Sequence, residues 1–300
     1  MGNELERKTI RFYYPLPRFP NVSITGSKCS LNCQHCSGHY LKGMTNVNTP
    51  EKLKNFARKL PETNGVGLLV SGGSDKAGKV PLEKFYDSLR WIKDHTELIV
   101  NLHTGLVDKV EARKIADTGV DIVSVDVVGS NETIKQVYGI NARVEDYRET
   151  LFNLKEAGVP HVVPHVCIGL HFGEIIGEFN AINMLEKMDL ENIVLLGLIP
   201  TSGTPMADVA PPSVEAFIRV IESAKEIFPR THVSIGCMRS KQDKVLFETS
   251  VISTGVDRLV LPSQSTIDWA LHQGYDVKMI DGCCSIPMKM EYKGLRINLP

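Results

Sequence analysis

The chain has 300 residues, of which 42% are hydrophobic and 23% charged, a composition typical of globular proteins. Its formal net charge is −1, so no overall field attracts nucleic acid or an anionic membrane. No apolar run approaches the roughly 20 residues of a membrane span, and residues 1–12 lack the apolar core of a signal peptide. We therefore expect a cytoplasmic protein whose seven cysteines serve metal binding or catalysis rather than disulfides.

Short apolar runs alternate with polar, helix-compatible stretches along the chain. Eight runs are mostly continuous in their apolar character, as in parallel strands buried on both faces: 22–25, 66–71, 98–104, 121–128, 161–170, 192–200, 232–237 and 258–262. Helical patterns occur at 50–60, 81–93, 107–118, 144–157, 178–188, 213–227 and 265–275. Gly119 and Gly158 fit the C-caps of two of these helices.

Eight β-then-α units predict an α/β fold, a single (β/α)8 TIM-type barrel. We assign residues 1–265 to this barrel. Residues 266–300 form a C-terminal helix and cysteine segment of the same domain, expected to close the barrel over its mouth. A doubly wound open sheet is the alternative, because periodicity alone does not count strands reliably.

Three cysteines follow the first predicted strand. Cys29, Cys33 and Cys36 have the spacing C-x3-C-x2-C, and three thiolates on one short loop can hold one face of a [4Fe–4S] cluster. Iron–sulfur clusters usually take four cysteine ligands, so one iron would keep an open position. Cys33 and Cys36 alone could form a redox dithiol or half of a zinc site. A dithiol needs no third cysteine, however, and the adjacent Cys283 and Cys284 make a poor second zinc pair.

This cysteine motif closely resembles that of the radical S-adenosylmethionine (radical SAM) superfamily. The resemblance implies that the open iron binds the amino and carboxylate groups of S-adenosylmethionine (SAM). It also implies that an electron from the cluster cleaves SAM to a 5′-deoxyadenosyl radical. The likeness covers about residues 20–265 and implies a full radical SAM barrel, in which the reactive groups lie at the C-terminal ends of the strands.

Other residues near the predicted strand ends resemble SAM-binding elements of the superfamily and of biotin synthase. His35 precedes the last cysteine, where an aromatic residue near the adenine is usual. Ser71 to Gly73 resemble the loop that receives the methionine amine, and Asp126 resembles the carboxylate that binds the ribose. The complete set implied to bind SAM is His35, Ser71, Gly72, Gly73, His103, Asp126, Gly169, Glu174 and Pro200.

Four further cysteines, Cys167, Cys237, Cys283 and Cys284, lie outside the motif. A free cysteine is often only a small buried hydrophobic residue. Biotin synthase, however, holds a second, sacrificial cluster with barrel-lining cysteines and an arginine, and Cys237 is close in sequence to Arg239. Lipoyl synthase also carries an auxiliary cluster. The resemblance therefore implies that these four cysteines hold an auxiliary cluster that donates sulfur.

The whole chain most resembles the archaeal-type, biotin synthase-related proteins that act in pairs as a two-component lipoyl synthase. The implied activity is that of a sulfurtransferase, which inserts sulfur into unactivated C–H bonds of a protein-bound octanoyl chain. The implied partners are a lipoyl carrier protein or octanoyl-peptide substrate, a paralogous radical SAM chain, and an electron donor such as ferredoxin or flavodoxin.

Two alternatives stay open from the sequence. A radical SAM mutase or maturase, like methylornithine synthase or the hydrogenase maturase, would need no auxiliary sulfur source. A non-enzymatic iron–sulfur scaffold would only store the cluster of Cys29, Cys33 and Cys36. The extra cysteines argue against the first alternative, and the candidate SAM-binding residues argue against the second.

Overall fold

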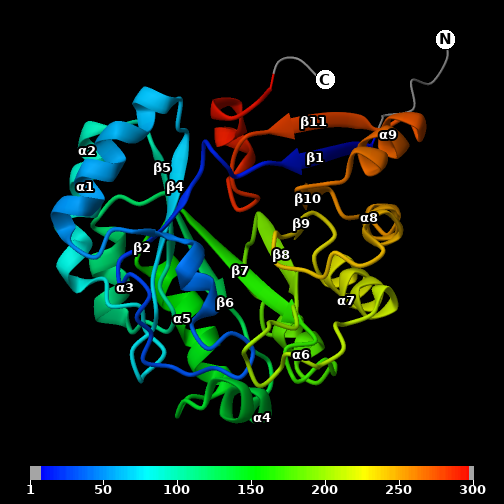
Figure 1. Cartoon of the computed structure of the whole chain (residues 1–300), viewed down its shortest axis with the longest axis horizontal. Coiled ribbons are helices and arrows are strands. Elements are labelled where there is room, and N and C mark those ends of the chain that lie inside the picture. The colour runs from blue at the N-terminus through cyan, green and yellow to red at the C-terminus, as the bar shows by residue number, and fades with distance from the viewer. Residues whose placement is uncertain (1–7, 297–300) are drawn as a thin grey trace.

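The computed structural model describes residues 8–296, in which one parallel sheet of eleven strands carries helices on its outer face (Figure 1). The strands are β1 (Thr9–Tyr13), β2 (Asn21–Ser23), β3 (Thr45–Asn46), β4 (Gly67–Ser71), β5 (Ile99–His103), β6 (Ile122–Asp126), β7 (His161–Ile168), β8 (Asn192–Gly197), β9 (His232–Ile235), β10 (Arg258–Val260) and β11 (Asp276–Ile280). Their order in the sheet is β11-β1-β10-β9-β8-β7-β6-β5-β4-β2-β3.

The α-helices of the described residues are α1 (Pro50–Lys59), α2 (Tyr86–His95), α3 (Lys109–Ala116), α4 (Asn131–Thr133), α5 (Val144–Glu156), α6 (Glu178–Asn183), α7 (Val214–Ile227), α8 (Lys244–Ser253) and α9 (Gln264–His272). Several begin at a side chain that accepts from a free backbone N–H of the first turn. Thr49 caps α1, Asp108 caps α3, and Ser213 caps α7. Among the described residues, no helix is long and apolar enough to span a membrane.

All eight predicted strands are confirmed, with ends that differ by a few residues. Gly119 and Gly158 have positive φ values (74° and 89°), as the predicted C-caps require. The sequence analysis missed β1, β3 and β11, as well as helices α4 and α8. The missed β11 alternates polar and apolar residues (Asp276, Val277, Lys278), because an edge strand has one partner and a solvated side. A search for continuous apolar runs does not detect such a strand.

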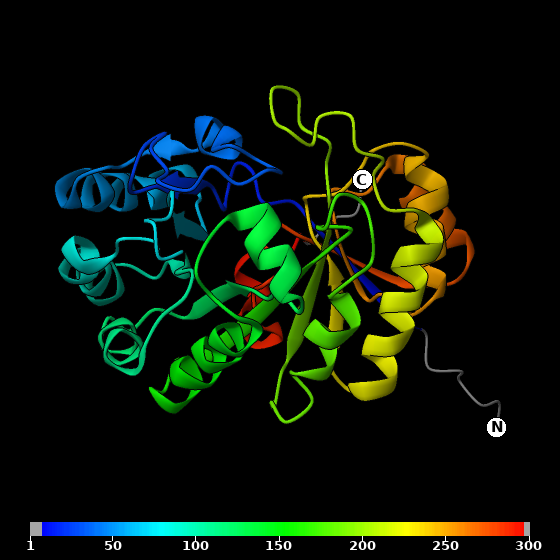
Figure 2. The ribbon, with the colours of Figure 1, turned by 90° about the horizontal axis from the view of Figure 1, so that it is seen from below.

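The predicted (β/α)8 barrel is confirmed in part: the sheet is parallel with helices on its outer face, but strand number and closure differ. The sheet has eleven strands, and it forms an open half-barrel that begins with β11 and ends with β3. The three additional strands lie at the two sides of the sheet: β1 pairs with β10 and β11, and β3 pairs with β2. Seen from below, the helices form an arc around the outer face of the sheet (Figure 2).

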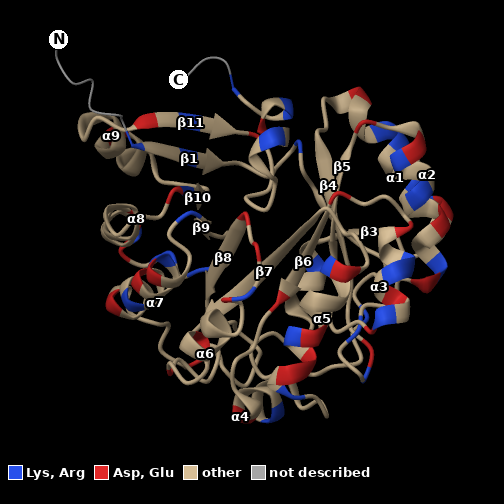
Figure 3. Cartoon of the chain, turned by 180° about the vertical axis from the view of Figure 1, so that it is seen from behind, with Lys and Arg blue, Asp and Glu red and all other residues tan. Residues whose placement is uncertain are grey.

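Two apolar layers hold the half-barrel together. The larger lies between the sheet and the helices, with fully buried residues such as Leu68, Leu89 and Val220. A smaller cluster lies inside the curve of the sheet, where Ile99 and Ile122 begin their strands. Lys, Arg, Asp and Glu residues are frequent on the helices, whereas strand β7 contains none of them (Figure 3). This pattern agrees with strands that are covered on both faces.

The C-terminal segment closes the opposite end of the lumen from the one predicted. We call the end at which β4 to β8 begin the floor, and the end at which they finish the mouth. The turn 281–287 lies at the floor, because the carbonyl of Cys284 accepts from Asn192, the first residue of β8, at 2.9 Å. The expected extension over the mouth is therefore wrong. The segment follows β11, and that strand brings it to the floor.

Candidate functional site

The loop that carries the three-cysteine motif is fixed by backbone hydrogen bonds at the mouth of the half-barrel. Ser30 N donates to Ser74 O at 2.8 Å, which attaches the loop to the turn after β4. Gln34 N donates to Val137 O at 2.9 Å, which attaches it to a π-helix, Ile134–Tyr138, after α4. π-helical turns are rare and are frequent at functional sites. The loop thus has two anchors that lie far from it in sequence.

A tight turn brings the thiols of Cys33 and Cys36 together with His35. Their ligand atoms lie within 4.8 Å of one another, the only such group of metal-ligating side chains among residues 8–296. The Cys33 thiol donates to Cys36, and this hydrogen bond, with a further one from His35, lowers the pKa of Cys36 to about 4. Cys36 is therefore a thiolate, the form that binds metals. Cys29 is partly exposed, and its Sγ faces Ser74 O at 3.8 Å.

The glycine loop after β4 approaches the cysteine loop closely, as the sequence predicts. A Cβ added to Gly73 would lie 2.1 Å from Lys28 O and 2.6 Å from the Cα of Cys29. The amide of Gly73 donates to Thr25 Oγ1 at 2.7 Å. Only glycine leaves room for this approach, so the glycine loop packs directly against the backbone of Cys29.

A cavity of about 340 Å³ extends along the lumen from the cysteine loop to the floor. One wall is apolar and comes largely from β8 and the residues after it, including Val194, Leu196 and Leu198. The part of the wall that comes from the neighbouring strands β7, β6 and β5 is polar. The predicted residues that line the cavity are His35, Ser71, His103, Asp126, Cys167, Cys237, Cys283 and Cys284.

Three polar side chains of the lumen come from adjacent strands. Asp126 pairs in register with His165, and the ring of His165 lies 5.5 Å from that of His103. Burial lowers the pKa of both imidazoles, and that of His165 falls to about 4, so both rings are neutral at pH 7. The sequence analysis identified His103 and Asp126 at strand ends but missed His165, because it lies inside a strand.

The four additional cysteines share this cavity but divide between its two ends. Burial and then the charge of Asp126 raise the pKa of Cys167, which lies two residues after His165, the register partner of Asp126. At the floor, the Cys284 thiol donates to Cys283 and lowers the pKa of Cys283 to about 6. Burial and the neighbouring Cys283 raise the pKa of Cys237. Cys283 and Cys284 therefore lie at the floor, whereas Cys167 and Cys237 lie nearer the mouth. Cys167 pairs in register with Leu196, and the carbonyl of Met238, next to Cys237, accepts from the amide of Gly197 at the end of β8.

The arginine beside the paired cysteines is Arg258, not Arg239. Arg239 donates to Glu248 at 2.7 Å and to Gly236 O at 2.8 Å, so its guanidinium is engaged away from the thiols. Arg258 is completely buried and donates to the carbonyl of Cys284 at 3.1 Å. Its place on the last predicted strand, inside an apolar run, was a signal that sequence analysis could have used.

Five predicted SAM-binding residues do not line the lumen cavity: Gly72, Gly73, Gly169, Glu174 and Pro200. Glu174 is exposed on the turn after β7. The buried glutamate of this region is Glu178, which accepts from Gly169 N at 2.7 Å and Gly177 N at 3.0 Å. It stabilises the loop rather than facing the lumen. Sequence analysis also missed Tyr40 and Tyr138, which line the cavity next to the cysteine loop.

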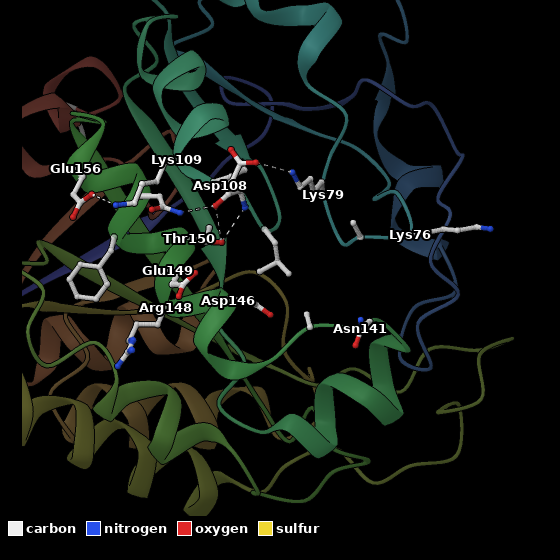
Figure 4. Close-up of a pocket in the computed structure, with 16 residues that line it drawn as sticks. Lys76, Lys79, Asp108, Lys109, Asn141, Asp146, Arg148, Glu149, Thr150 and Glu156 are labelled. Atoms are coloured by element: carbon white, nitrogen blue, oxygen red, sulfur yellow. Dashed lines mark hydrogen bonds and ion pairs between the residues drawn. The ribbon is translucent and has the colours of Figure 1, made fainter.

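A larger hollow of about 1040 Å³ lies outside the sheet, between α3 and α5 (Figure 4). Half of its charged side chains pair with each other: Lys109 with Glu156 at 3.4 Å and Lys79 with Asp108 at 3.9 Å. The cysteines lie elsewhere, in the lumen and in the loop at its mouth. The lumen is therefore the candidate site.

The residues at the mouth fit a [4Fe–4S] cluster with SAM beside it. Three cysteines lie on one loop, one of them as a thiolate. The buried Nδ1 of His35 has no hydrogen-bond partner, which indicates room for a ligand group next to the cluster. The lumen cavity begins at this point, and the ring of His35 packs edge-on against Tyr138 at 5.5 Å.

Several relatives with known names match most of the chain. It is 26% identical over 226 residues to a biotin synthase of Syntrophotalea carbinolica, covering 71% of the chain and 66% of that protein. It is 29% identical over 244 residues to a biotin synthase of Chromohalobacter salexigens, covering 74% of the chain and 61% of that protein. The chain thus spans slightly less than two thirds of the length of these relatives.

Solved structures show the same fold. Methylornithine synthase has a TM-score of 0.63 at 12% identity, covering 90% of the chain and 83% of that protein. The [FeFe]-hydrogenase maturase of Carboxydothermus hydrogenoformans also has a TM-score of 0.63 at 12% identity, covering 92% of the chain and 69% of the maturase. Residues 23–182 match the family described as the radical SAM superfamily. They include the cysteine loop, the Gly72–Gly73 turn and Asp126, and the chain belongs to the radical SAM superfamily.

Proposed function

We propose that the protein inserts sulfur into unactivated C–H bonds of a protein-bound octanoyl chain, as one component of a two-protein lipoyl synthase. The observation that carries this proposal is a single cavity that joins the cysteine loop at the mouth to Cys283 and Cys284 at the floor and is also lined by Cys167 and Cys237. When bound, the cluster and SAM supply a radical that abstracts hydrogen from such bonds. The chain's own residues then have to hold the substrate between that radical and a sulfur source.

The walls of the cavity suit an aliphatic substrate. Val194, Leu196 and Leu198 form an apolar strip on one side, and Leu41 and Met44 from the cysteine loop add to the apolar surface at the mouth. An extended methylene chain placed along this strip would be removed from water, which favours binding by roughly 0.8 kcal/mol per buried methylene. The strip leads from the mouth toward Cys283 and Cys284.

The floor cysteines are the proposed source of sulfur, as ligands of an auxiliary cluster. Cys283 is poised as a thiolate, because Cys284 donates to it and Ser285 N donates at 3.5 Å. Thiolates are the ligands of iron–sulfur clusters. Cys237 and Cys167, which lie further toward the mouth, are the proposed third and fourth ligands. A carrier protein with an octanoyl group, a paralogous radical SAM chain and a ferredoxin or flavodoxin are the proposed partners.

The test is anaerobic turnover of an octanoyl-lysine peptide with SAM, dithionite and the partner chain. The double variant Cys283→Ser/Cys284→Ser should lose thiolated product but still form 5′-deoxyadenosine, because radical generation depends on the first cluster. The control Ser285→Ala alters the same turn without removing sulfur and should keep the product. Thiolated product from the double variant would refute the role of these cysteines.

Iron content provides a second, independent measurement. A triple variant with alanine at Cys29, Cys33 and Cys36 should form no 5′-deoxyadenosine, since the cluster that binds SAM has lost its ligands. It should nevertheless hold about four irons per chain if the four lumen cysteines bind a cubane. An iron-free triple variant would leave those cysteines as packing residues, and the sulfur-insertion proposal would then fail.

A further inference from the structure

We propose that the cysteine loop has a second metal-binding mode, in which Cys33, His35 and Cys36 bind one zinc ion when the iron–sulfur cluster is absent. The ligand atoms of these three side chains already lie within 4.8 Å of one another. Zinc binds cysteine sulfur at about 2.3 Å and histidine nitrogen at about 2.0–2.1 Å in tetrahedral geometry, so neighbouring ligand atoms lie roughly 3.5–3.8 Å apart. A small adjustment of the side chains therefore suffices.

His35 is the residue that separates this mode from cluster binding. Its Nδ1 is buried and has no hydrogen-bond partner, which is costly unless a ligand occupies it. The ring packs edge-on against Tyr138 at 5.5 Å, and this contact restricts its orientation. Two thiols and an imidazole are a common zinc ligand set. The fourth tetrahedral position is left to water.

Cys29 does not take part in the zinc mode as the loop stands. Its Sγ faces Ser74 O at 3.8 Å, on the side of the loop supported by Gly73. A cubane needs Cys29 because each thiolate binds a different iron, whereas zinc draws its ligands to one point. Cys33 and Cys36 serve both metals, so the two modes exclude each other. Zinc is then a competitor of cluster assembly at this loop.

The test uses the metal-free chain with Cys283→Ser/Cys284→Ser as the parent, so that the floor thiols do not compete. Adding His35→Phe keeps an aromatic ring against Tyr138 and removes the nitrogen. Adding Cys29→Ser instead removes the ligand that only the cluster uses. Zinc affinity is measured by competition with a chromophoric chelator, and cobalt substitution reports thiolate ligation by its charge-transfer absorption.

We expect one zinc per parent chain, unchanged affinity in the Cys29→Ser variant, and at least about a hundredfold weaker binding in the His35→Phe variant, since loss of a supporting contact alone costs 10–100-fold. Iron reconstitution should show the reverse: the His35→Phe variant keeps its first cluster, and the Cys29→Ser variant loses it. This retained cluster also shows that the His35→Phe variant is folded. The proposal would be overturned if the His35→Phe variant bound zinc as tightly as the parent, or if the Cys29→Ser variant lost as much zinc affinity as the His35→Phe variant.

Discussion

The guanidinium of Arg258, on strand β10, donates to the main-chain carbonyl of Cys284, in the turn 281–287 at the lumen floor, at 3.1 Å. The same group donates to Ile286 O at 2.9 Å and lies 3.3 Å from Glu291. Arg258 is completely buried, and a buried charge is tolerated only when it is paired and hydrogen-bonded. The position of the paired cysteines therefore depends on a cation from β10.

Replacing Arg258 with methionine should destabilise the fold by about 3–5 kcal/mol, because Glu291 and two carbonyls lose their partner. Urea unfolding measures this change, and faster reaction of Cys283 with a thiol reagent should accompany it. The control is Arg296→Ala, which breaks a partly exposed ion pair with Asp281 and should cost less than about 1 kcal/mol. Similar losses for both variants would show that burial of Arg258 has no special effect.

Replacing Gly73 with alanine should impair assembly of the first cluster. The added Cβ would meet the backbone at Lys28 O and Cys29, and backbone atoms cannot move aside without shifting the loop. We expect lower iron content after reconstitution and little 5′-deoxyadenosine. Gly43→Ala is the matched control, since a Cβ there meets nothing within 4 Å. Full iron loading of the Gly73→Ala chain would mean that the loop adjusts freely.

Asp126 and Glu174 should differ in their effect on SAM binding. Asp126 lines the lumen cavity, whereas Glu174, on the turn after β7, does not. Loss of a charge-assisted hydrogen bond costs about 1.5–3 kcal/mol, roughly ten- to a hundredfold in affinity. Asp126→Ala should therefore weaken SAM binding by that factor in a calorimetric titration with the reconstituted protein, and Glu174→Ala should not. Unchanged affinity in the Asp126→Ala variant would assign that residue to the scaffold.

The sequence analysis located the strands well because parallel strands buried on both faces leave continuous apolar runs. It failed where burial is one-sided or the element very short, as in β11 and the two-residue β3. The number of strands in the sheet and its closure depend on which strand edges pair with each other. The residues of β1 do not by themselves indicate that this strand inserts between β10 and β11.

The residues of the candidate site likewise fall into those that the sequence predicts and those that it does not. The cysteine loop, Gly73 and Asp126 were predictable because fixed spacing or a strand end identifies them. The end of the lumen reached by Cys283 and Cys284 was not, since it depends on hydrogen bonds to Asn192 and to a buried arginine far away in sequence. Spacing from Cys237 suggested Arg239, but the tertiary contact belongs to Arg258.

Glu191 connects the C-terminal segment to the floor, and its ionisation should contribute to acid stability. Its carboxylate accepts from Met288 N at 2.7 Å and lies 3.3 Å from Nδ1 of His161. The hydrogen bond with His161, supported by the amide of Met288, lowers the pKa of Glu191 from 4.5 to about 2. Because the folded state holds this proton less tightly, the stabilisation is complete above pH 4.5 and is lost as pH falls toward 2.

Glu191→Gln should therefore flatten the fall in unfolding free energy between pH 4.5 and 2. Near pH 7 it should lower stability by less than about 1 kcal/mol, because solvent screens this partly exposed carboxylate. Urea unfolding across a pH series measures both effects. Glu97→Gln is the control, since Glu97 also pairs with a cation, Lys293, but is fully exposed and should leave the pH dependence unchanged. If the Glu191→Gln curve runs parallel to that of the unmodified protein down to pH 2, ionisation of Glu191 is not coupled to folding, and the contact with Met288 serves only to position the segment.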